Sequence, residues 1–303
     1  MSSQQSSSAG GPHRKLVTRP KAKILVDGGD PRETQMIKEL IGFVDGQTTN
    51  PSLIAKNPDI IRLVQAGHKL TEQQEAEEYR KIVLAISPLV GDGGVSIEVF
   101  ADLRTTAEQM FRQGQDMFTW IPNAYVKYPC TAEGFRAAEL SVASGIRVNM
   151  TLCFSQQQAA AVYAATRGTR EPAYVSPFIG RLDDIGRKGV DLVSNITRMY
   201  EKGDGHVLVL AASIRSVAHL LYCFSVGADL VTVPAKVLRA WAEEGFPMPD
   251  EHFAYAGTGS PIPYETLDLE QPWRSFDLDH QLTTKGIEKF VADYRATLYA
   301  HAP

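Results

Sequence analysis

A lysine and two carboxylates, Lys127, Asp27 and Glu98, occupy equivalent places in three short runs with the composition of β-strands. Side chains alternate between the two faces of a strand, so residues two apart share a face. The aliphatic neighbours of each charged residue would point the opposite way, which predicts that all three charged groups enter one enclosed space. A structural ion pair explains any single member equally well, but the whole set favours catalysis because isolated buried charges are costly.

Small polar side chains extend this set. The same alternation directs Ser96, Asn149, Thr151 and Ser176 toward the same interior. Among apolar walls the ammonium form of a lysine is disfavoured, which leaves a nucleophilic amine. An amine beside carboxylates and hydroxyl groups suits carbonyl chemistry through an imine. A metal fits poorly, because the only one of the seven histidines in these strands is His206, at a strand start.

Two arginines follow later strands. Arg215 comes just after Ser213, where a strand ends and a helix begins, and Arg181 follows the strand before it. Free N–H groups at a helix start attract anions, and a guanidinium can hold a phosphate with two hydrogen bonds. Either arginine alone is more often a surface ion-pair former. For the two arginines taken together, binding of a phosphate and ion pairing at the surface are equally good interpretations.

These residues need a framework of repeated strands. Eight β-type runs are separated mostly by segments with helical apolar spacing, and the runs are residues 23–27, 43–48, 95–100, 124–130, 147–154, 173–179, 206–213 and 230–234. Capping boxes are predicted at Thr71 with Gln74 and at Ser155 with Gln158, and Gly227 closes the apolar stripe from Val217 to Phe224. Eight repeats favour a closed (β/α)₈ barrel, an α/β fold, over its rival, a doubly wound open sheet.

The remaining segments do not follow the repeat. Residues 1–22 are rich in Ser, Gln and Gly at their start and are expected to be a disordered tail, so the barrel domain is assigned to residues 23–303. The Pro-rich segment 244–282 is expected to be an irregular excursion on the barrel exterior. Residues 284–298 predict a final helix that covers the barrel, with a lid or an oligomer contact as the alternative.

Composition narrows the class of protein. Of the 303 residues 44% are hydrophobic and 22% are charged, which is usual for a soluble globular chain. A net charge of −4 argues against nucleic acid or an anionic membrane as the main partner. Three scattered cysteines indicate a reducing compartment, and no apolar run would span a bilayer. A cytoplasmic protein is therefore expected.

Six blocks in this sequence resemble the transaldolase and fructose-6-phosphate aldolase family, in the family's order. They are DGQTTNPSLI at 45–54, VKYPCT at 126–131, GIRVNMTLCFS at 145–155, VSPFIGRLD at 175–183, LAASIR at 210–215 and LTTKGIEKF at 282–290. The start DGGD at 27–30 departs slightly from the usual pattern, and VFAD at 99–102 is more like the smaller subfamilies. These departures leave the oligomeric state and the range of acceptors open.

The resemblance implies a role for each matched residue. Lys127 would form the Schiff base, and Asp27 would take the proton of the substrate C4 hydroxyl as the C3–C4 bond breaks. Glu98 and Thr151 would hold a water molecule during imine formation and hydrolysis. The substrate-binding residues implied or inferred from the strands are Thr48, Asn50, Ser96, Asn149, Ser176, Phe178, Arg181, Ser213 and Arg215. We expect the nearby lysine to keep the pKa of Asp27 low, so that the carboxylate is ionised.

The function implied is transfer of a dihydroxyacetone unit from a ketose phosphate to an aldose phosphate in the non-oxidative pentose phosphate pathway. No cofactor or metal is implied, sugar phosphates are the expected partners, and a homo-oligomer is expected. The rival within the family is a fructose-6-phosphate aldolase that releases free dihydroxyacetone. That branch carries Tyr at the position of Phe178 and Gln at that of Glu98, so both residues here match the transferases. A rival of another class is a noncatalytic sugar-phosphate-binding barrel, which would not need Lys127 beside two carboxylates.

Overall fold

A computed structural model describes residues 17–298, and within that range eight parallel strands close into a barrel in the order β1 to β8. The strands are β1 (Lys23–Asp27), β2 (Gly46–Thr48), β3 (Gly94–Glu98), β4 (Ala124–Pro129), β5 (Val148–Cys153), β6 (Ala173–Pro177), β7 (Val207–Ala211) and β8 (Leu230–Val233). Because β1 pairs with both β2 and β8, the sheet has no edge. The prediction of a barrel is confirmed, and the doubly wound sheet is excluded.

All eight predicted strands exist, although seven are shorter than predicted at one or both ends. The strand predicted over 43–48 begins only at Gly46, because Asp45 turns its side chain back to accept from the backbone N–H of Ile24. The run predicted over 173–179 ends at Pro177, since Ile179 already starts a helix. Apolar composition alone does not show where a ladder of hydrogen bonds stops.

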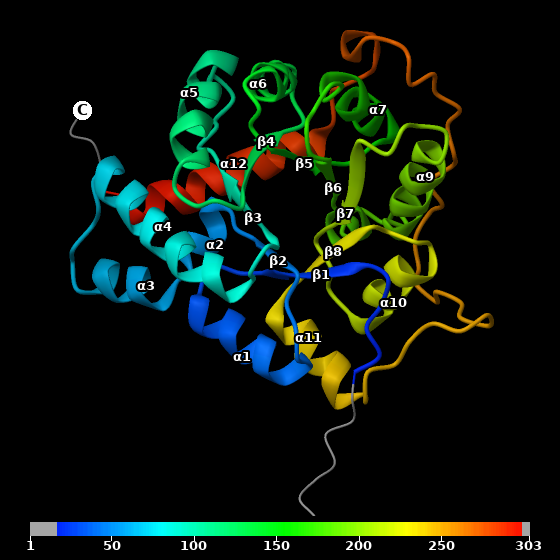
Figure 1. The fold of residues 1–303 in the computed structure, drawn as a ribbon, viewed down its shortest axis with the longest axis horizontal. Helices are drawn as coiled ribbons and strands as arrows, with labels where there is room; N and C mark the ends of the chain where they lie inside the picture. Colours follow the sequence, from blue (N-terminus) through cyan, green and yellow to red (C-terminus); the bar gives the residue numbers. More distant parts are fainter. Residues whose placement is uncertain (1–16, 299–303) are drawn as a thin grey trace, which may run out of the picture.

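Helices surround the barrel (Figure 1). They are α1 (Pro31–Ile41), α2 (Pro51–Ala55), α3 (Pro58–Gln65), α4 (Glu72–Ile86), α5 (Ala107–Phe118), α6 (Ala132–Ala143), α7 (Gln156–Ala165), α8 (Ile179–Asp183), α9 (Val190–Tyr200), α10 (Val217–Ser225), α11 (Ala235–Glu243) and α12 (Gln281–Thr297), with 3₁₀ turns at Ser87–Leu89 and Trp273–Ser275. The capping box of Thr71 and Gln74 is present at the start of α4. The box predicted at Ser155 is only half right, because Gln158 Oε1 accepts from Phe154 N–H, one residue too early.

One layer of the barrel interior is apolar. Five side chains fill it, and they are Leu25, Tyr125, Tyr174, Leu210 and Leu230. The rings of Tyr125 and Tyr174 stack with centroids 4.1 Å apart. We call this cluster the floor of the barrel. Leu25 and Tyr125 share strand faces with Asp27 and Lys127, which the alternation of side chains assigned to the interior, so that part of the prediction is confirmed.

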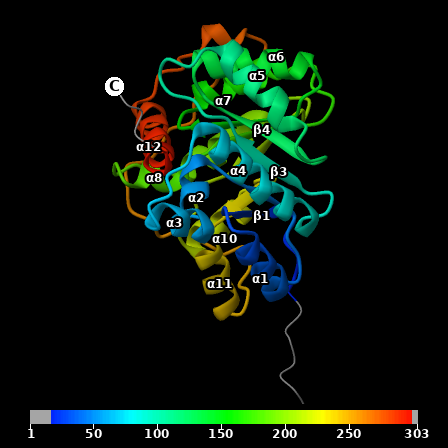
Figure 2. The same ribbon diagram turned by 90° about the vertical axis from the view of Figure 1, so that its left-hand side faces the viewer.

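The Pro-rich segment runs along the outside of the barrel, past α10, α9 and α7, as predicted (Figure 1). It is held by side chains of those helices: Asn195 donates to the carbonyl of Ile262, and Gln156 donates to the carbonyl of Glu265. Helix α12 then lies across one end of the barrel beside α2 and α8 (Figure 2). It buries Ile287, Phe290 and Val291 against that end.

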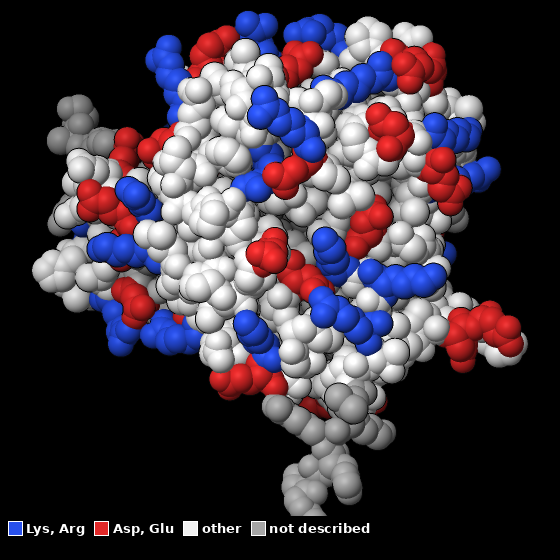
Figure 3. Space-filling view, viewed as in Figure 1, with Lys and Arg blue, Asp and Glu red and all other residues white. Residues whose placement is uncertain are grey.

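Charges on the surface are mixed in sign. On the face in Figure 3, lysines and arginines alternate with aspartates and glutamates, and no large area carries one sign. None of the helices described between residues 17 and 298 combines the length and apolarity that crossing a bilayer requires. Most of the predicted N-terminal tail lies outside the described residues, and Ala22 at its end is buried.

Candidate active site

Lys127 lies in the middle of β4 and is buried inside the barrel, with 3% of its surface exposed. Strands β3 and β4 pair Glu98 with Lys127, so the two side chains extend inward as neighbours. Lys127 Nζ lies 2.9 Å from Glu98 Oε2 and donates a hydrogen bond of 3.0 Å to the carbonyl of Thr49. The lysine is therefore held in place by one charge and one carbonyl, and its nitrogen also faces a pocket.

Glu98 and Thr151 are incompletely satisfied. Glu98 Oε2 is close enough to Lys127 for an ion pair, but the contact lacks the angles of a hydrogen bond, and Thr151 Oγ1 has no partner among the described residues. Buried polar atoms normally have partners, so two such atoms beside the lysine mark a place for water or a substrate group. Burial raises the pKa of Glu98, and the charge of Lys127 lowers it to a lesser extent. A raised pKa suits a carboxyl that both takes and gives protons.

Asp27 ends β1 at the opposite side of the barrel interior. Thr48 donates to Asp27 Oδ1 at 2.8 Å and also lies 2.6 Å from the hydroxyl of Thr232. Burial raises the pKa of Asp27, while the charge of Lys127 and the Thr48 hydrogen bond lower it to a lesser extent. The expectation of a lowered pKa is thus wrong, because desolvation of the carboxylate outweighs the attraction of the lysine.

A chain of hydrogen bonds links three of the small polar residues. Ser176 donates to Asn149 Oδ1 at 2.8 Å, and Asn149 Nδ2 donates to Ser96 Oγ at 3.0 Å. All three are buried between the floor and the pocket. Asn50, in contrast, caps α2 by accepting from the backbone N–H of Leu53 at 2.9 Å. These bonds fix the orientation of the amides around Lys127.

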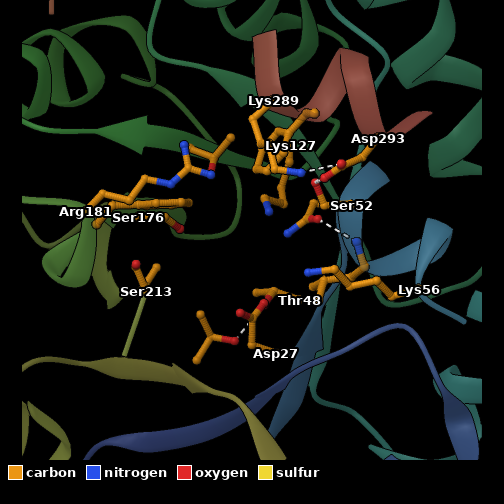
Figure 4. Close-up of a pocket in the computed structure, with 17 residues that line it drawn as sticks. Asp27, Thr48, Ser52, Lys56, Lys127, Ser176, Arg181, Ser213, Lys289 and Asp293 are labelled. Carbon is orange, nitrogen blue, oxygen red and sulfur yellow. Dashed lines mark hydrogen bonds and ion pairs between the residues drawn. The ribbon is translucent and has the colours of Figure 1, made fainter. Parts of the chain in front are cut away.

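The pocket above these groups has a volume of about 210 Å³ and opens beneath α12. Figure 4 shows Lys127 and Asp27 on opposite sides of it, with Arg181, Ser176 and Ser213 on a third side. Nine of the predicted site residues line it, and they are Asp27, Thr48, Asn50, Lys127, Thr151, Ser176, Phe178, Arg181 and Ser213. Ser96, Glu98, Asn149 and Arg215 do not line it. The first three lie behind its wall.

The two arginines differ. Arg181 is half-buried between the rings of Phe178 and Phe290, 5.4 Å from each centroid, and none of the carboxylates described between residues 17 and 298 lies within ion-pairing distance of it. Arg215 pairs through both guanidinium nitrogens with Asp184 outside the pocket. Ser213 has a positive φ of 58°, which a non-glycine residue adopts at a cost. Of the predicted phosphate residues, the structure therefore brings Arg181 and Ser213 to the pocket and leaves Arg215 beside it.

Sequence reasoning missed five polar residues of the pocket: Ser52, Lys56, Thr232, Lys289 and Asp293. Thr232 belongs to β8, and the other four come from α2, the turn after it and α12. Lys289 pairs with Asp293, four residues on, and Ser52 donates to the same carboxylate. Spacing in one helix could have suggested the Lys289–Asp293 pair. The helix covers the barrel, as predicted, but nothing in the sequence showed that it does so at the end where the pocket opens.

Cationic groups outnumber anionic ones around the pocket. Lys56, Lys127, Arg181 and Lys289 line it with only two carboxylates, Asp27 and Asp293. This balance suits an anionic substrate that also carries a carbonyl for the lysine. Among the described residues, no group of three or more His, Cys, Asp or Glu is arranged to hold a metal ion.

Comparison with known proteins gives a consistent picture. A family model described as transaldolase/fructose-6-phosphate aldolase matches residues 24–300. A protein named probable transaldolase from Parabacteroides distasonis is 39% identical over 273 residues, which are 90% of this chain and 98% of the relative. Similar proteins of the same name occur in Bacteroides thetaiotaomicron, at 36% over 273 residues (90% and 98%), and Paracoccus denitrificans, at 34% over 275 residues (91% and 97%).

Proposed function

The chain belongs to the transaldolase/fructose-6-phosphate aldolase family, and we propose that it is a transaldolase that works through a Schiff base on Lys127. The donor would be sedoheptulose 7-phosphate or fructose 6-phosphate, and the acceptor glyceraldehyde 3-phosphate or erythrose 4-phosphate. The observation that carries the proposal is the buried Lys127–Glu98 pair at one side of a cationic pocket whose other side holds Asp27.

Imine formation is the first step of the proposed reaction. Lys127 passes a proton to Glu98, and its free amine attacks the ketose carbonyl to form a C–N bond while the C=O π pair moves onto oxygen. A proton then moves from the new ammonium nitrogen to that oxygen, which becomes the hydroxyl of the adduct. Glu98 then returns the proton to the hydroxyl of the adduct, the C–O bond breaks and water leaves. Thr151 would hold that water, since its hydroxyl has no other partner among the described residues. The product is a protonated imine.

Bond cleavage follows at Asp27. The carboxylate takes the proton of the C4 hydroxyl, the C3–C4 electron pair moves into the imine, and an aldose phosphate leaves a neutral enamine behind. The enamine attacks the aldehyde of the acceptor, and Asp27 returns its proton to the new hydroxyl. A carboxyl whose pKa is raised by burial is well suited to hold the proton between these two events.

Substrate binding would place the phosphate at Arg181 and Ser213 and the dihydroxyacetone unit near Asn50 and Ser176. Asn149 would orient Ser176 through its hydrogen bond and reach the substrate from the wall of the pocket. Arg215 would join the phosphate site only by leaving Asp184. A guanidinium without a direct ion pair to a described carboxylate, such as Arg181, is suited to a doubly charged phosphate.

The aldolase rival differs in what happens to the enamine. Phe178 lines the pocket and packs edge-on against Phe154, with ring centroids 5.6 Å apart, so its own side chain offers no proton where a tyrosine would place a hydroxyl. An enamine without a donor nearby persists until an aldehyde arrives. A coupled assay with fructose 6-phosphate, with and without erythrose 4-phosphate, separates the two activities. We expect glyceraldehyde 3-phosphate to form rapidly only with the acceptor, and equal rates without it would make the protein an aldolase.

Further parts of the proposal concern the setting of the reaction. They are a place in the non-oxidative pentose phosphate pathway in the cytoplasm, action without a cofactor, and assembly as a homo-oligomer. The mixed surface charge in Figure 3 supports small anions rather than nucleic acid as partners. Size-exclusion chromatography with light scattering would test the assembly.

A further inference from the structure

A second cavity of about 200 Å³ lies beside the barrel, where α4 and α5 flank β3 (Figure 1). Its rim carries the exposed side chains of Glu72 and Asp116, and its inner end reaches Glu98. Glu98 lines this cavity but not the substrate pocket, although its carboxylate pairs with Lys127. The carboxylate thus forms part of a wall between the two spaces.

Glu75 is the polar group inside this second cavity. It is 6% exposed, and its carboxylate has no hydrogen bond or ion pair with any described residue. Burial raises the pKa of Glu75 to about 7. The other ionisable groups that line the cavity are Glu72, Asp116, Glu98, Tyr79 and Tyr294, and no lysine or arginine is among its described lining residues. A buried carboxyl without a protein partner requires water to satisfy it.

The cavity can supply that water. Its volume is large enough for several water molecules, and carboxyl groups at both ends provide hydrogen-bonding partners. A buried water needs two to four polar partners, and a purely apolar void of similar size stays dry. The aromatic rings of Tyr79 and Trp120 form its sides, while Asp116 accepts a 3.0 Å hydrogen bond from the Trp120 indole and holds that ring in place.

Tyr79 separates the cavity from the lysine. Its hydroxyl accepts from the backbone N–H of Glu98 at 3.0 Å and lies 2.5 Å from Thr49 Oγ1. The hydroxyl of Thr49 donates to the carbonyl of Ser96, so Tyr79 donates to Thr49. The carbonyl of Thr49 accepts from Lys127. The Tyr79 hydroxyl therefore both donates and accepts hydrogen bonds within the protein and has a structural role. Among the described residues that line the cavity, Glu98 is the one whose carboxyl also contacts Lys127.

We propose that this second cavity is a water route to the Schiff-base site, kept wet by Glu75 and ending at Glu98. The inference rests on the proposed function, in which each imine formed releases one water and each imine hydrolysed consumes one. A sugar phosphate fills the front pocket during both steps. Water released from the imine carbon then passes Glu98 into the cavity behind it, and water for hydrolysis comes from the cavity by the same way. The protons follow the course already described, and none is gained or lost.

Isotope retention tests this route. A ketose phosphate donor labelled with ¹⁸O at C2 is allowed one round of transfer, and the label at C2 of the new ketose is measured by mass spectrometry. In the unaltered protein the released water exchanges through the cavity, so the new ketose carries little label. Ala76→Leu would fill the cavity and Glu75→Leu would dry it. In both variants we expect the released water to stay at Glu98 and Thr151, and the retained label to rise severalfold.

The chain offers matched controls. Ala85→Leu makes the same change at an exposed position of α4 outside the cavity, and should retain as little label as the unaltered protein. Glu75→Gln keeps a polar group in the cavity and should lie closer to the unaltered protein than Glu75→Leu. A merely structural role of α4 would slow transfer without changing the retained fraction.

Two other outcomes overturn the inference in different ways. Equal retention in Ala76→Leu, Glu75→Leu, Ala85→Leu and the unaltered protein would show that water leaves through the substrate mouth. If Ala76→Leu fails to fold, Glu75→Leu carries the comparison alone. If the unaltered protein forms no transfer product and no borohydride-trapped adduct, the transaldolase mechanism itself fails, and the water route fails with it.

Discussion

The floor and the mouth of the barrel are built on the same strands, only two residues apart, yet they have opposite character. The mouth is the end of the barrel interior that holds the substrate pocket. In four strands a floor residue is followed, two positions later, by a polar residue of the mouth. The pairs are Leu25 and Asp27 in β1, Tyr125 and Lys127 in β4, Tyr174 and Ser176 in β6, and Leu230 and Thr232 in β8. Both sets point inward, because residues two apart share a strand face. The floor is a packed apolar core, whereas the mouth is the polar substrate pocket. Burial raises the pKa of Asp27, which lines the mouth, and of Glu98, which lies behind its wall beside Lys127.

The difference shows how one fold divides stability from chemistry. The floor removes large apolar side chains from water, which stabilises the folded state by about 25 cal/mol for each Å² buried. The mouth buries charges, which is unfavourable unless they are paired. The closed ring of strands lets the first region support the second. Substitutions at the mouth should therefore change activity more than stability, and those in the floor should do the reverse.

The largest effect is expected at Lys127. Lys127→Met keeps a side chain of similar length but removes the amine, so no imine can form and transfer should be abolished. Removal of the buried ammonium also relieves the cost of its burial, although it leaves Glu98 without a charged partner. Activity is measured in the coupled assay, and circular dichroism checks that the variant folds. Transfer at more than a trace level would contradict the mouth's assignment.

The floor offers the opposite result. Leu210 is fully buried in it, and Leu210→Ala should lower the free energy of unfolding by about 2–5 kcal/mol through lost contacts and a cavity. The rate constant for transfer, per folded molecule, should stay near that of the unaltered protein. Urea unfolding and the coupled assay give the two values. Leu84→Ala, at an exposed position, is the control and should change neither.

Much of this division was predictable from the sequence, because alternation in the strands assigns Asp27, Glu98 and Lys127 to the interior without any knowledge of the helices. What could not be predicted depends on contacts distant in sequence. The Lys289–Asp293 pair reaches the pocket only because α12 crosses it, and Arg215 is held outside by Asp184. The pKa of Asp27 was predicted with the wrong sign, since the depth of its burial is a property of the closed barrel.

Substitution of the two carboxyls that act on the substrate, Asp27 in the pocket and Glu98 behind its wall, should affect different steps of the reaction. Asp27→Asn should still form the imine but cleave slowly, whereas Glu98→Gln should slow imine formation itself. We expect a loss of about 10²-fold or more in turnover for each, the usual contribution of a positioned acid or base. Single-turnover trapping with borohydride measures imine formation separately from cleavage. The same trapping defect in both variants would contradict the separate roles.

A smaller effect is expected at the arginines. Arg181→Ala removes a guanidinium that lines the pocket without a direct ion pair to a described carboxylate, and should weaken binding of phosphorylated sugars by about 1.5–3 kcal/mol. Arg215→Ala should cost less, because Arg215 must first give up Asp184. The KM values for fructose 6-phosphate and for free dihydroxyacetone are compared in each variant. Equal changes for both substrates would place the arginines outside the phosphate site.

Covalent trapping tests most directly whether Lys127 is the nucleophile that attacks the ketose carbonyl. The protein is incubated with fructose 6-phosphate and borohydride, which reduces an imine to a stable amine, and peptides are then mapped by mass spectrometry. We expect one reduced dihydroxyacetone unit on Lys127 and none on the pocket lysines Lys56 and Lys289. An adduct on either of these, or no adduct while transfer proceeds, would contradict this role of Lys127.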